Sequence, residues 1–127
     1  MKESAAAVFF WVFVGGALGS IAREVLTPLL TWEPAWAVIM LVNVAAAFLA
    51  GWLYGSSDRL HHHLVSFAAV GFCGGFSTFS TFADQVLGLV AAGDLPQASL
   101  DIAGTLILGI AAAYLGDLLG GKSFKDR

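Results

Sequence analysis

The amino-acid sequence predicts an all-α membrane protein with four transmembrane helices, the third of them broken. Of its 127 residues, 58% are hydrophobic and only 12% are charged, and the mean hydropathy is +0.82. About a quarter of the residues of a soluble domain are charged, so this composition cannot supply a polar exterior. Four apolar blocks reach the roughly 20 residues that a helix needs to cross a bilayer. We therefore expect a single four-helix domain, multi-pass in the cell membrane, with spans at about 5–30, 35–54, 64–92 and 98–119.

The first block, about 5–30, is expected to be a retained helix that packs closely against its neighbours. Pro28 ends it, because proline lacks the N–H that a continuing helix needs. A cleaved signal peptide is the alternative interpretation, but the apolar stretch is longer than the apolar region of an ordinary signal peptide. The block also carries the small-residue face typical of packed transmembrane helices, formed by Gly15, Gly16 and Gly19.

Polar segments separate the remaining blocks. The second block ends at residues 55–59, and the fourth ends at residues 120–122. Three consecutive histidines, residues 61–63, lie in the loop before the third block. Consecutive side chains cannot all converge on one metal ion, so we expect a solvated loop there.

The third block, about 64–92, contains a segment that a lipid-facing helix would not carry. Its glycines weaken the helix and free backbone carbonyls, and its hydroxyls place polar groups at bilayer depth. Non-helical backbone is tolerated inside a membrane only where protein buries it or a water-filled cavity lines it. We therefore predict a broken helix and a functional centre that passes a small polar species. The segment comprises Gly71, Gly74, Gly75, Ser77, Thr78, Ser80 and Thr81, with Phe76, Phe79 and Phe82 at every third position.

Helical geometry over residues 76–82 indicates the kind of solute. On a continuous helix Phe76, Phe79 and Phe82 fall within an arc of about 120°, and the hydroxyls fill the opposite side. The edge of a phenyl ring is positive, so ring edges and hydroxyl hydrogens both suit an anion, whereas a cation finds no carboxylate. The pattern indicates a small dehydrated anion. The alternative is phenylalanine packed against lipid, with each hydroxyl bonded to its own backbone.

Three polar side chains in the other spans are candidate functional residues, because polar groups are costly in a bilayer. Asn43 lies midway along the second block, and its amide can bind an anion, hold a bent backbone or join two helices. Arg23, beside Glu24, can form an ion pair, reach the interface or give an anion pathway a positive potential. Thr105 in the fourth block can bond the carbonyl four residues earlier. Three further acids are expected near span ends: Asp84, Asp101 and Asp117.

Two classes of function are excluded. The net charge is −3, and no basic stripe exists to neutralise the phosphates of a nucleic acid. No Ser-His-Asp, Cys-His, paired-carboxylate or phosphate-loop arrangement occurs, so the sequence predicts no enzyme. The single cysteine, Cys73, cannot form an intrachain disulfide.

Residues 71–82, GFCGGFSTFSTF, closely resemble the third-helix signature of the fluoride channel family (CrcB/Fluc). Residues 15–23, GGALGSIAR, are similar to the family's first-helix glycine run, which ends in arginine. Residues 42–44 together with Gly51 are similar to its second-helix asparagine segment. The likeness covers nearly the full length of the chain.

The resemblance implies a dimer of two four-helix subunits packed antiparallel, with two fluoride pathways along the interface. It implies a structural sodium ion between the subunits, bound by the backbone carbonyls of Gly74 and Ser77. By the same resemblance Phe79 and Phe82 face the fluoride path with their ring edges and Asn43 lies at its end. Further polar groups on the path are Ser80, Thr81 and Thr105, with Arg23 as a source of positive potential.

Three positions depart from the family pattern. Ser77 stands where threonine is usual, a change without effect if only the carbonyl is used. Gln85 stands where a vestibule glutamate is common. Gly109 stands where some members carry serine, which leaves one end of the polar track without a hydroxyl.

The resemblance thus implies a passive fluoride channel that exports the anion and protects a microbial cell from it. The alternatives are a non-conducting subunit of a heterodimeric channel and a small four-helix multidrug exporter. Such exporters generally need a carboxylate within the membrane, and the first three spans have none near their middle.

The distribution of basic residues indicates how the chain is oriented in the membrane and with which partner it forms a dimer. Short loops rich in Lys and Arg stay cytoplasmic. The side that holds both termini carries five basic residues, against Arg23 alone on the other side, so we expect both termini inside. An antiparallel homodimer requires insertion in both orientations and hence balanced charge, so a heterodimer with an inverted paralogue is the alternative. The five residues are Lys2, Arg59, Lys122, Lys125 and Arg127.

Overall fold

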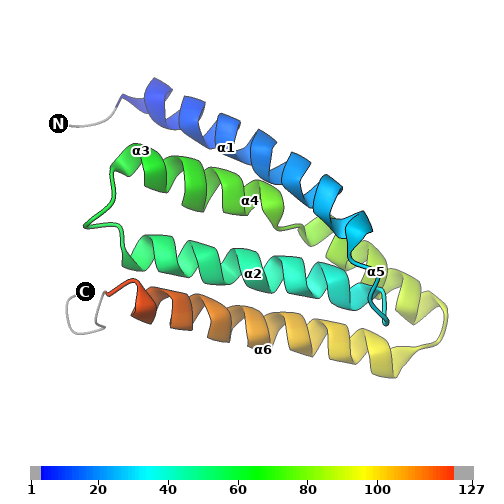
Figure 1. Ribbon diagram of the computed structural model, residues 1–127. Coiled ribbons are helices and arrows are strands. Elements are labelled where there is room, and N and C mark those ends of the chain that lie inside the picture. Colours follow the sequence, from blue (N-terminus) through cyan, green and yellow to red (C-terminus); the bar gives the residue numbers. More distant parts are fainter. Residues whose placement is uncertain (1–3, 122–127) are drawn as a thin grey trace.

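The computed structural model describes residues 4–121, which form helical spans lying side by side with short connections (Figure 1). The described residues contain no strand, and four of the spans are long and apolar enough to cross a membrane. The predicted fold class, an all-α membrane protein with four transmembrane helices, is confirmed. The elements are α1 (Ala5–Leu26), η1 (Thr27–Leu29), α2 (Trp36–Gly55), α3 (His62–Val65), η2 (Ser66–Phe72), α4 (Cys73–Phe76), α5 (Phe79–Ala91) and α6 (Leu95–Leu119).

The fourth span begins three residues earlier than predicted. The Asp94 carboxylate caps α6 by accepting hydrogen bonds from the Gln97 N–H at 3.3 Å and from the Gln97 side-chain amide at 2.7 Å. Pro96 lies in the first turn, where the missing N–H has no helical partner to lose. Asp101, expected near the end of its span, therefore lies about two turns inside α6.

The third span is made of α3, η2, α4 and α5, and its backbone leaves the helical conformation between α4 and α5. Ser77 has φ −73° and ψ 156°, and Thr78 has φ −146° and ψ 119°, so both residues are extended. Upstream, η2 consists of wide π-helical turns, which are common next to functional sites. The two extended residues follow the glycine-rich helix α4 directly.

The extended residues also divide the three phenylalanines that the sequence placed on one face. Phe76 belongs to α4, stacks on Phe72 with ring centroids 5.7 Å apart and packs against the apolar core. Phe79 and Phe82 belong to α5, and their rings are 6.0 Å apart. The prediction of a three-ring row is therefore wrong for Phe76, because it assumed a continuous helix.

Glycines allow the helices to pack in two closely spaced pairs, α1 with η2 and α4, and α2 with α6. A methyl group at Gly75 of α4 would collide with the Gly16 carbonyl of α1. A methyl group at Gly51 of α2 would collide with the Ala113 carbonyl of α6. The same constraint holds at Gly15, Gly19, Gly55, Gly71 and Gly116.

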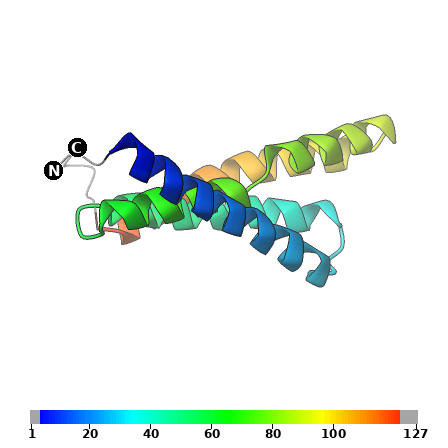
Figure 2. The ribbon, with the colours of Figure 1, turned by 90° about the horizontal axis from the view of Figure 1, so that it is seen from above.

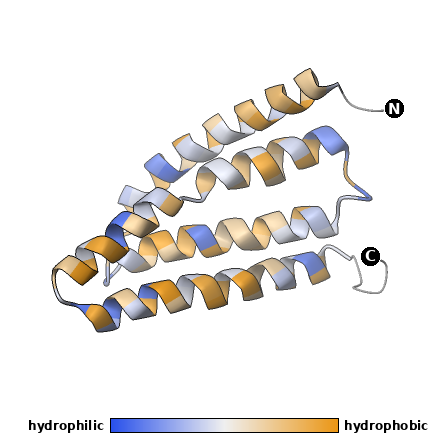
Figure 3. Cartoon of the chain, turned by 180° about the vertical axis from the view of Figure 1, so that it is seen from behind, coloured by the Kyte–Doolittle hydropathy of each residue, from blue (hydrophilic) through white to orange (hydrophobic). Residues whose placement is uncertain are grey.

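A small core joins the two pairs. It is formed by the buried residues Ala46 and Leu53 of α2, Ala69 of η2 and Cys73 of α4. Most large apolar side chains instead face outward, and hydrophobic residues cover most of the length of the helices (Figure 3). An apolar exterior of this extent suits contact with lipid.

The direction of the third span changes after Thr78. Before the extended residues it packs on α1, whereas α5 packs on α6 and diverges from α1 (Figure 2). This divergence separates α5 from the end of α1 and brings α5 against α6, where the candidate site lies.

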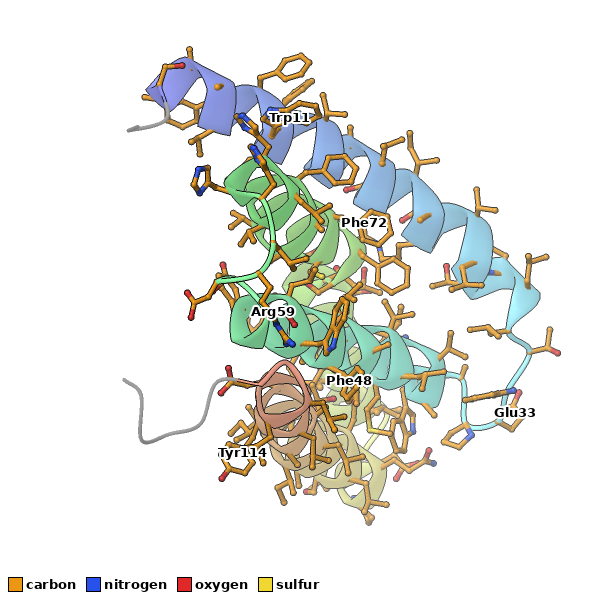
Figure 4. The ribbon with its side chains drawn as sticks, turned by 60° about the vertical axis from the view of Figure 1, so that its left-hand side comes forward. Trp11, Glu33, Phe48, Arg59, Phe72 and Tyr114 are labelled. Atoms are coloured by element: carbon orange, nitrogen blue, oxygen red, sulfur yellow. The ribbon has the colours of Figure 1, made fainter. Side chains whose placement is uncertain are left out.

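One basic side chain ties the ends of two spans together. Arg59, in the connection between α2 and α3, donates a hydrogen bond to the Gly120 carbonyl at the end of α6 (Figure 4). The other basic residues expected on that side, Lys2, Lys122, Lys125 and Arg127, lie outside the described residues.

Replacing Gly75 by alanine is expected to lower the thermal stability of the protein in detergent. The added methyl group meets backbone, which cannot move as a flexible side chain can, and overpacking of this kind costs about 1–3 kcal/mol. Gly88→Ala on α5 is the matched control, because no atom lies within 4 Å of the added methyl group. Circular dichroism on heating measures both, and equal melting temperatures would contradict the close packing of α1 on α4.

Candidate functional site

The amide of Asn43 binds the backbone of the third span where that backbone is extended. The Thr78 N–H donates to Asn43 Oδ1 at 2.8 Å, and Asn43 Nδ2 donates to the Thr78 carbonyl at 3.1 Å. Thr78 is 7% exposed, so without Asn43 its two backbone groups would be buried and unpaired. Of the roles that the sequence left open for Asn43, holding a bent backbone is the one that the structure displays.

The Thr78 side chain is the centre of a hydroxyl cluster that caps α5. Its Oγ1 accepts from the Thr81 N–H at 3.2 Å and donates to Thr81 Oγ1 at 3.1 Å. The Ser80 hydroxyl lies 3.3 Å from Thr78 Oγ1. Threonine is a favoured helix cap because its side chain accepts a hydrogen bond from an otherwise unpaired N–H. Sequence reasoning placed Thr78 among the hydroxyls but missed that the others are organised around it.

Arg23 of α1 binds the other side of the break. One guanidinium nitrogen donates to the Gly75 carbonyl at 2.9 Å and to the Ser77 carbonyl at 3.0 Å. These carbonyls lie at the C-terminal end of α4, where positive charge also complements the helix dipole. Arg23 Nε forms an ion pair with Glu24 at 3.5 Å, which is one of the roles that the sequence left open for it, whereas its bonds to the carbonyls of the break were not predicted.

A pocket of about 350 Å³ opens between α2, the break, α5 and α6. It brings together most of the predicted pathway residues: Asn43, Phe79, Phe82 and Thr105 all line it. Phe79 is 80% exposed in the single chain, which is unusual for a ring beside buried polar groups. The remaining lining residues are Ala47, Ser77, Thr78, Leu106, Gly109 and Ile110.

A second pocket of about 490 Å³ lies beside the connection between α1 and α2. Thr81 and Gln85 of α5 line it, together with Trp32 and Glu33 of the connection. Thr78 lines the first pocket and Thr81 lines the second, and their hydroxyls are hydrogen-bonded at 3.1 Å. Ser80, predicted on the same track, lines neither pocket and is exposed.

Thr105 is held by a buried acid that sequence reasoning had placed at the end of a span. The Thr105 hydroxyl donates to Asp101 Oδ1 at 3.2 Å, one turn earlier on α6, and Asp101 is 0% exposed. The signal that could have revealed the pair was the cap of α6, since an Asp followed two residues later by Pro marks a helix start. Starting the helix at Leu95 places Asp101 within the span, four residues before Thr105.

The carbonyls expected to bind sodium belong to Gly74, in α4, and to Ser77, directly after α4. The Ser77 hydroxyl donates to the Gly74 carbonyl at 3.4 Å. Oxygen atoms are the donors that hard cations prefer, and a methyl group at Gly74 would meet no atom within 4 Å, so that side of the helix is open. The chemistry of these oxygen atoms fits a hard cation.

The fold and the site define a class: a multi-pass membrane protein with a broken span and a polar pocket at the break. The family model "CrcB-like protein, Camphor Resistance (CrcB)" matches residues 10–117. The fluoride-specific ion channel FluC of Ruegeria pomeroyi is 42% identical over 130 residues, covering 94% of each chain. FluC of Gloeobacter violaceus is 40% identical, covering 84% of this chain and 90% of its own. FluC of Pyrococcus furiosus is 36% identical, covering 85% and 91%. The chain belongs to the CrcB family.

Replacing Asn43 by leucine is expected to destabilise the protein and to abolish ion transport. It leaves the buried N–H and carbonyl of Thr78 unpaired, at about 1–3 kcal/mol for each group. Met40→Leu, about one turn earlier on α2, is the control, because this apolar exchange keeps the volume. Thermal unfolding in detergent compares the two, and equal melting temperatures would mean that Asn43 does not hold the break.

Proposed function

We propose that this chain forms a passive, fluoride-selective channel in the cell membrane and that fluoride leaves the cell through it. The observation that carries the proposal is the pocket at the break, where an amide and hydroxyls face two phenylalanine side chains. The relatives named as fluoride-specific ion channels support the identity of the ion. A passive channel suffices for protection: hydrogen fluoride enters through lipid as a neutral acid, ionises inside, and the anion needs an exit.

The lining of the pocket favours a small anion over a cation. None of its lining residues is acidic or basic, and its polar groups include the amide of Asn43 and the hydroxyls of Thr78 and Thr105. In the single chain these two hydroxyls donate their hydrogens to Thr81 and Asp101, so each must rotate to donate to an anion. Asn43 Nδ2 has a second hydrogen, which no hydrogen bond among the described residues uses. Phe79 and Phe82 can add positive ring edges. Fluoride is a compact and strong hydrogen-bond acceptor, so it gains more from each such donor than a larger anion does, and this gain offsets its larger cost of dehydration.

The two pockets supply a route. Fluoride in the pocket beside Phe79 reaches the hydroxyl of Thr78, and the adjoining hydroxyl of Thr81 faces the second pocket. Arg23 adds positive charge on the α1 side of the break. Charge of this sign raises the local concentration of anions and speeds their entry.

A second copy of the chain would complete the site. The pocket opens at the outer surface of a single chain, where the 80% exposed Phe79 would otherwise meet lipid. Polar groups facing hydrocarbon are unfavourable, so we propose that an antiparallel partner covers the pocket. The partner is a copy of this chain or an inverted paralogue, as the uneven distribution of basic residues leaves open.

The sodium ion belongs to the same proposal. In an antiparallel dimer the carbonyls of Gly74 and Ser77 from both chains would surround one central cation, whose charge would stabilise oxygen atoms that the break leaves without helical partners. Arg23 already binds the Ser77 carbonyl, and a carbonyl has a second lone pair for an ion.

Replacing Phe79 or Phe82 by isoleucine is expected to reduce fluoride efflux at least tenfold while the assembled protein stays intact, because isoleucine fills space but has no positive edge. Liposomes that contain only this purified chain, loaded with fluoride and read by a fluoride electrode, measure the rate. Phe13→Ile on α1 is the matched control, since Phe13 is 76% exposed and lies outside both pockets. Rates equal to wild type in both variants would exclude the rings from the path.

Replacing Gly74 by valine is expected to weaken dimer formation without unfolding the subunit. Within one chain a Cβ at this position meets nothing within 4 Å, so we expect a loss of assembly to arise from contact with a partner. Gly74→Ala, with a smaller side chain, should have a weaker effect. Cross-linking in membranes measures the dimer fraction in sodium and in a bulky organic cation. A dimer fraction that changes with neither substitution and is the same in both cations would contradict the proposed interface and its sodium ion.

A further inference from the structure

Asp101 is an acid buried inside the fourth span with only half of its hydrogen-bonding capacity used. The residue is 0% exposed. Its Oδ1 accepts the hydrogen of the Thr105 hydroxyl at 3.2 Å, whereas its Oδ2 is buried without a hydrogen-bond partner among the described residues. Acids within a membrane are rare and commonly mark a functional site.

The helices packed around Asp101 carry no basic side chain that could balance its negative charge. In the described chain α6 packs on α2 and α5, and none of these three helices contains Lys, Arg or His. Their titratable groups are Tyr54, near the far end of α2, the exposed Asp84 on α5, and Tyr114 and Asp117 on α6, three to four turns from Asp101. At the start of α6, Asp94 is engaged by Gln97.

The hydrogen bond between Thr105 and Asp101 has a direction, and this direction matters to an anion. A hydroxyl has a single hydrogen. When Thr105 gives this hydrogen to an ionised Asp101, it turns only lone pairs toward the pocket that it lines with Phe79 and Phe82. Lone pairs repel an anion, so in this arrangement Thr105 contributes nothing to fluoride binding.

We propose that Asp101 is a proton-binding site that controls whether Thr105 can donate its hydroxyl hydrogen to fluoride. The inference rests on the proposed function and adds a form of regulation to it. A protonated Asp101 carries a hydrogen of its own and donates it to Thr105 Oγ1. Thr105 then rotates its hydrogen toward the pocket, and a negative charge near the anion disappears in the same step. Asp101 is thus a positioning residue that acts through Thr105.

Proton and fluoride binding are then coupled. A proton at Asp101 strengthens fluoride binding in the pocket, and by reciprocity fluoride in the pocket strengthens proton binding at Asp101. The channel conducts best in acid, the condition under which hydrogen fluoride enters a cell. No proton is transported, since Asp101 faces the pocket only through Thr105.

Fluoride currents through the purified chain in planar bilayers, recorded at equal pH on both sides, test the inference. From alkaline to acidic pH the wild-type current should rise roughly two- to tenfold, the factor that one hydrogen bond of ordinary strength contributes. Asp101→Asn donates to Thr105 at every pH, so its current should stay at the acidic wild-type level throughout. Asp84→Asn removes an exposed acid instead and should keep the wild-type pH dependence.

The substitution Thr105→Val tests the role of the Thr105 hydroxyl separately from the charge of Asp101. It keeps Asp101 but removes the group through which the acid acts, so its smaller current should not depend on pH. A pH dependence that persists in Asp101→Asn, or one that persists in Thr105→Val, would overturn the inference. A wild-type fluoride current that is the same at every pH would also overturn it and leave the proposed function intact. A wild-type chain that carries no fluoride current at any pH overturns the proposed function, and this inference with it.

Discussion

Two residues of extended backbone in the middle of an apolar span impose the constraint on which the rest of this structure depends. Inside a bilayer no water pairs with a free N–H or carbonyl, and each unpaired group costs several kcal/mol. Asn43 of α2 binds both backbone groups of Thr78, and Arg23 of α1 binds the carbonyls of Gly75 and Ser77. These two polar side chains, which are costly inside a membrane, thus compensate for the backbone of the third span, which explains why they occur there.

The break determines where the site lies. Because helix α4 stops at Phe76, the chain can turn from α1 toward α6, and the glycines before the break let α4 lie against the backbone of α1. The new direction places the hydroxyl cluster of Thr78 and the rings of Phe79 and Phe82 beside α2 and α6. In the proposed function, the polar groups that stabilise the break are therefore also the groups that receive the anion.

The sequence predicted the membrane class and the four spans because composition and block length reflect the bilayer directly. It also identified Asn43, Phe79, Phe82 and Thr105, which the pocket brings together. The prediction that Phe76 shares a face with Phe79 and Phe82 was wrong, because it assumed one continuous helix. Two extended residues separate Phe76 from the other two rings. The environment of Asp101 was missed because the helix start was placed at 98 and not at Leu95, which moved the acid from the interior of a span to its end. The side chains that bind the break come from other helices, so they are determined by how the helices pack. The local sequence pattern around the break does not identify them.

The reversal potential of the purified chain in a planar bilayer tests the central claim most directly. The claim is that the pocket at the break passes fluoride passively and discriminates against larger anions by its lining of hydroxyls, amide and rings. With unequal fluoride concentrations on the two sides and an opposite chloride gradient, the account predicts a steady current that reverses close to the equilibrium potential of fluoride. A reversal potential midway between those of the two anions, or at that of the cation, would contradict it.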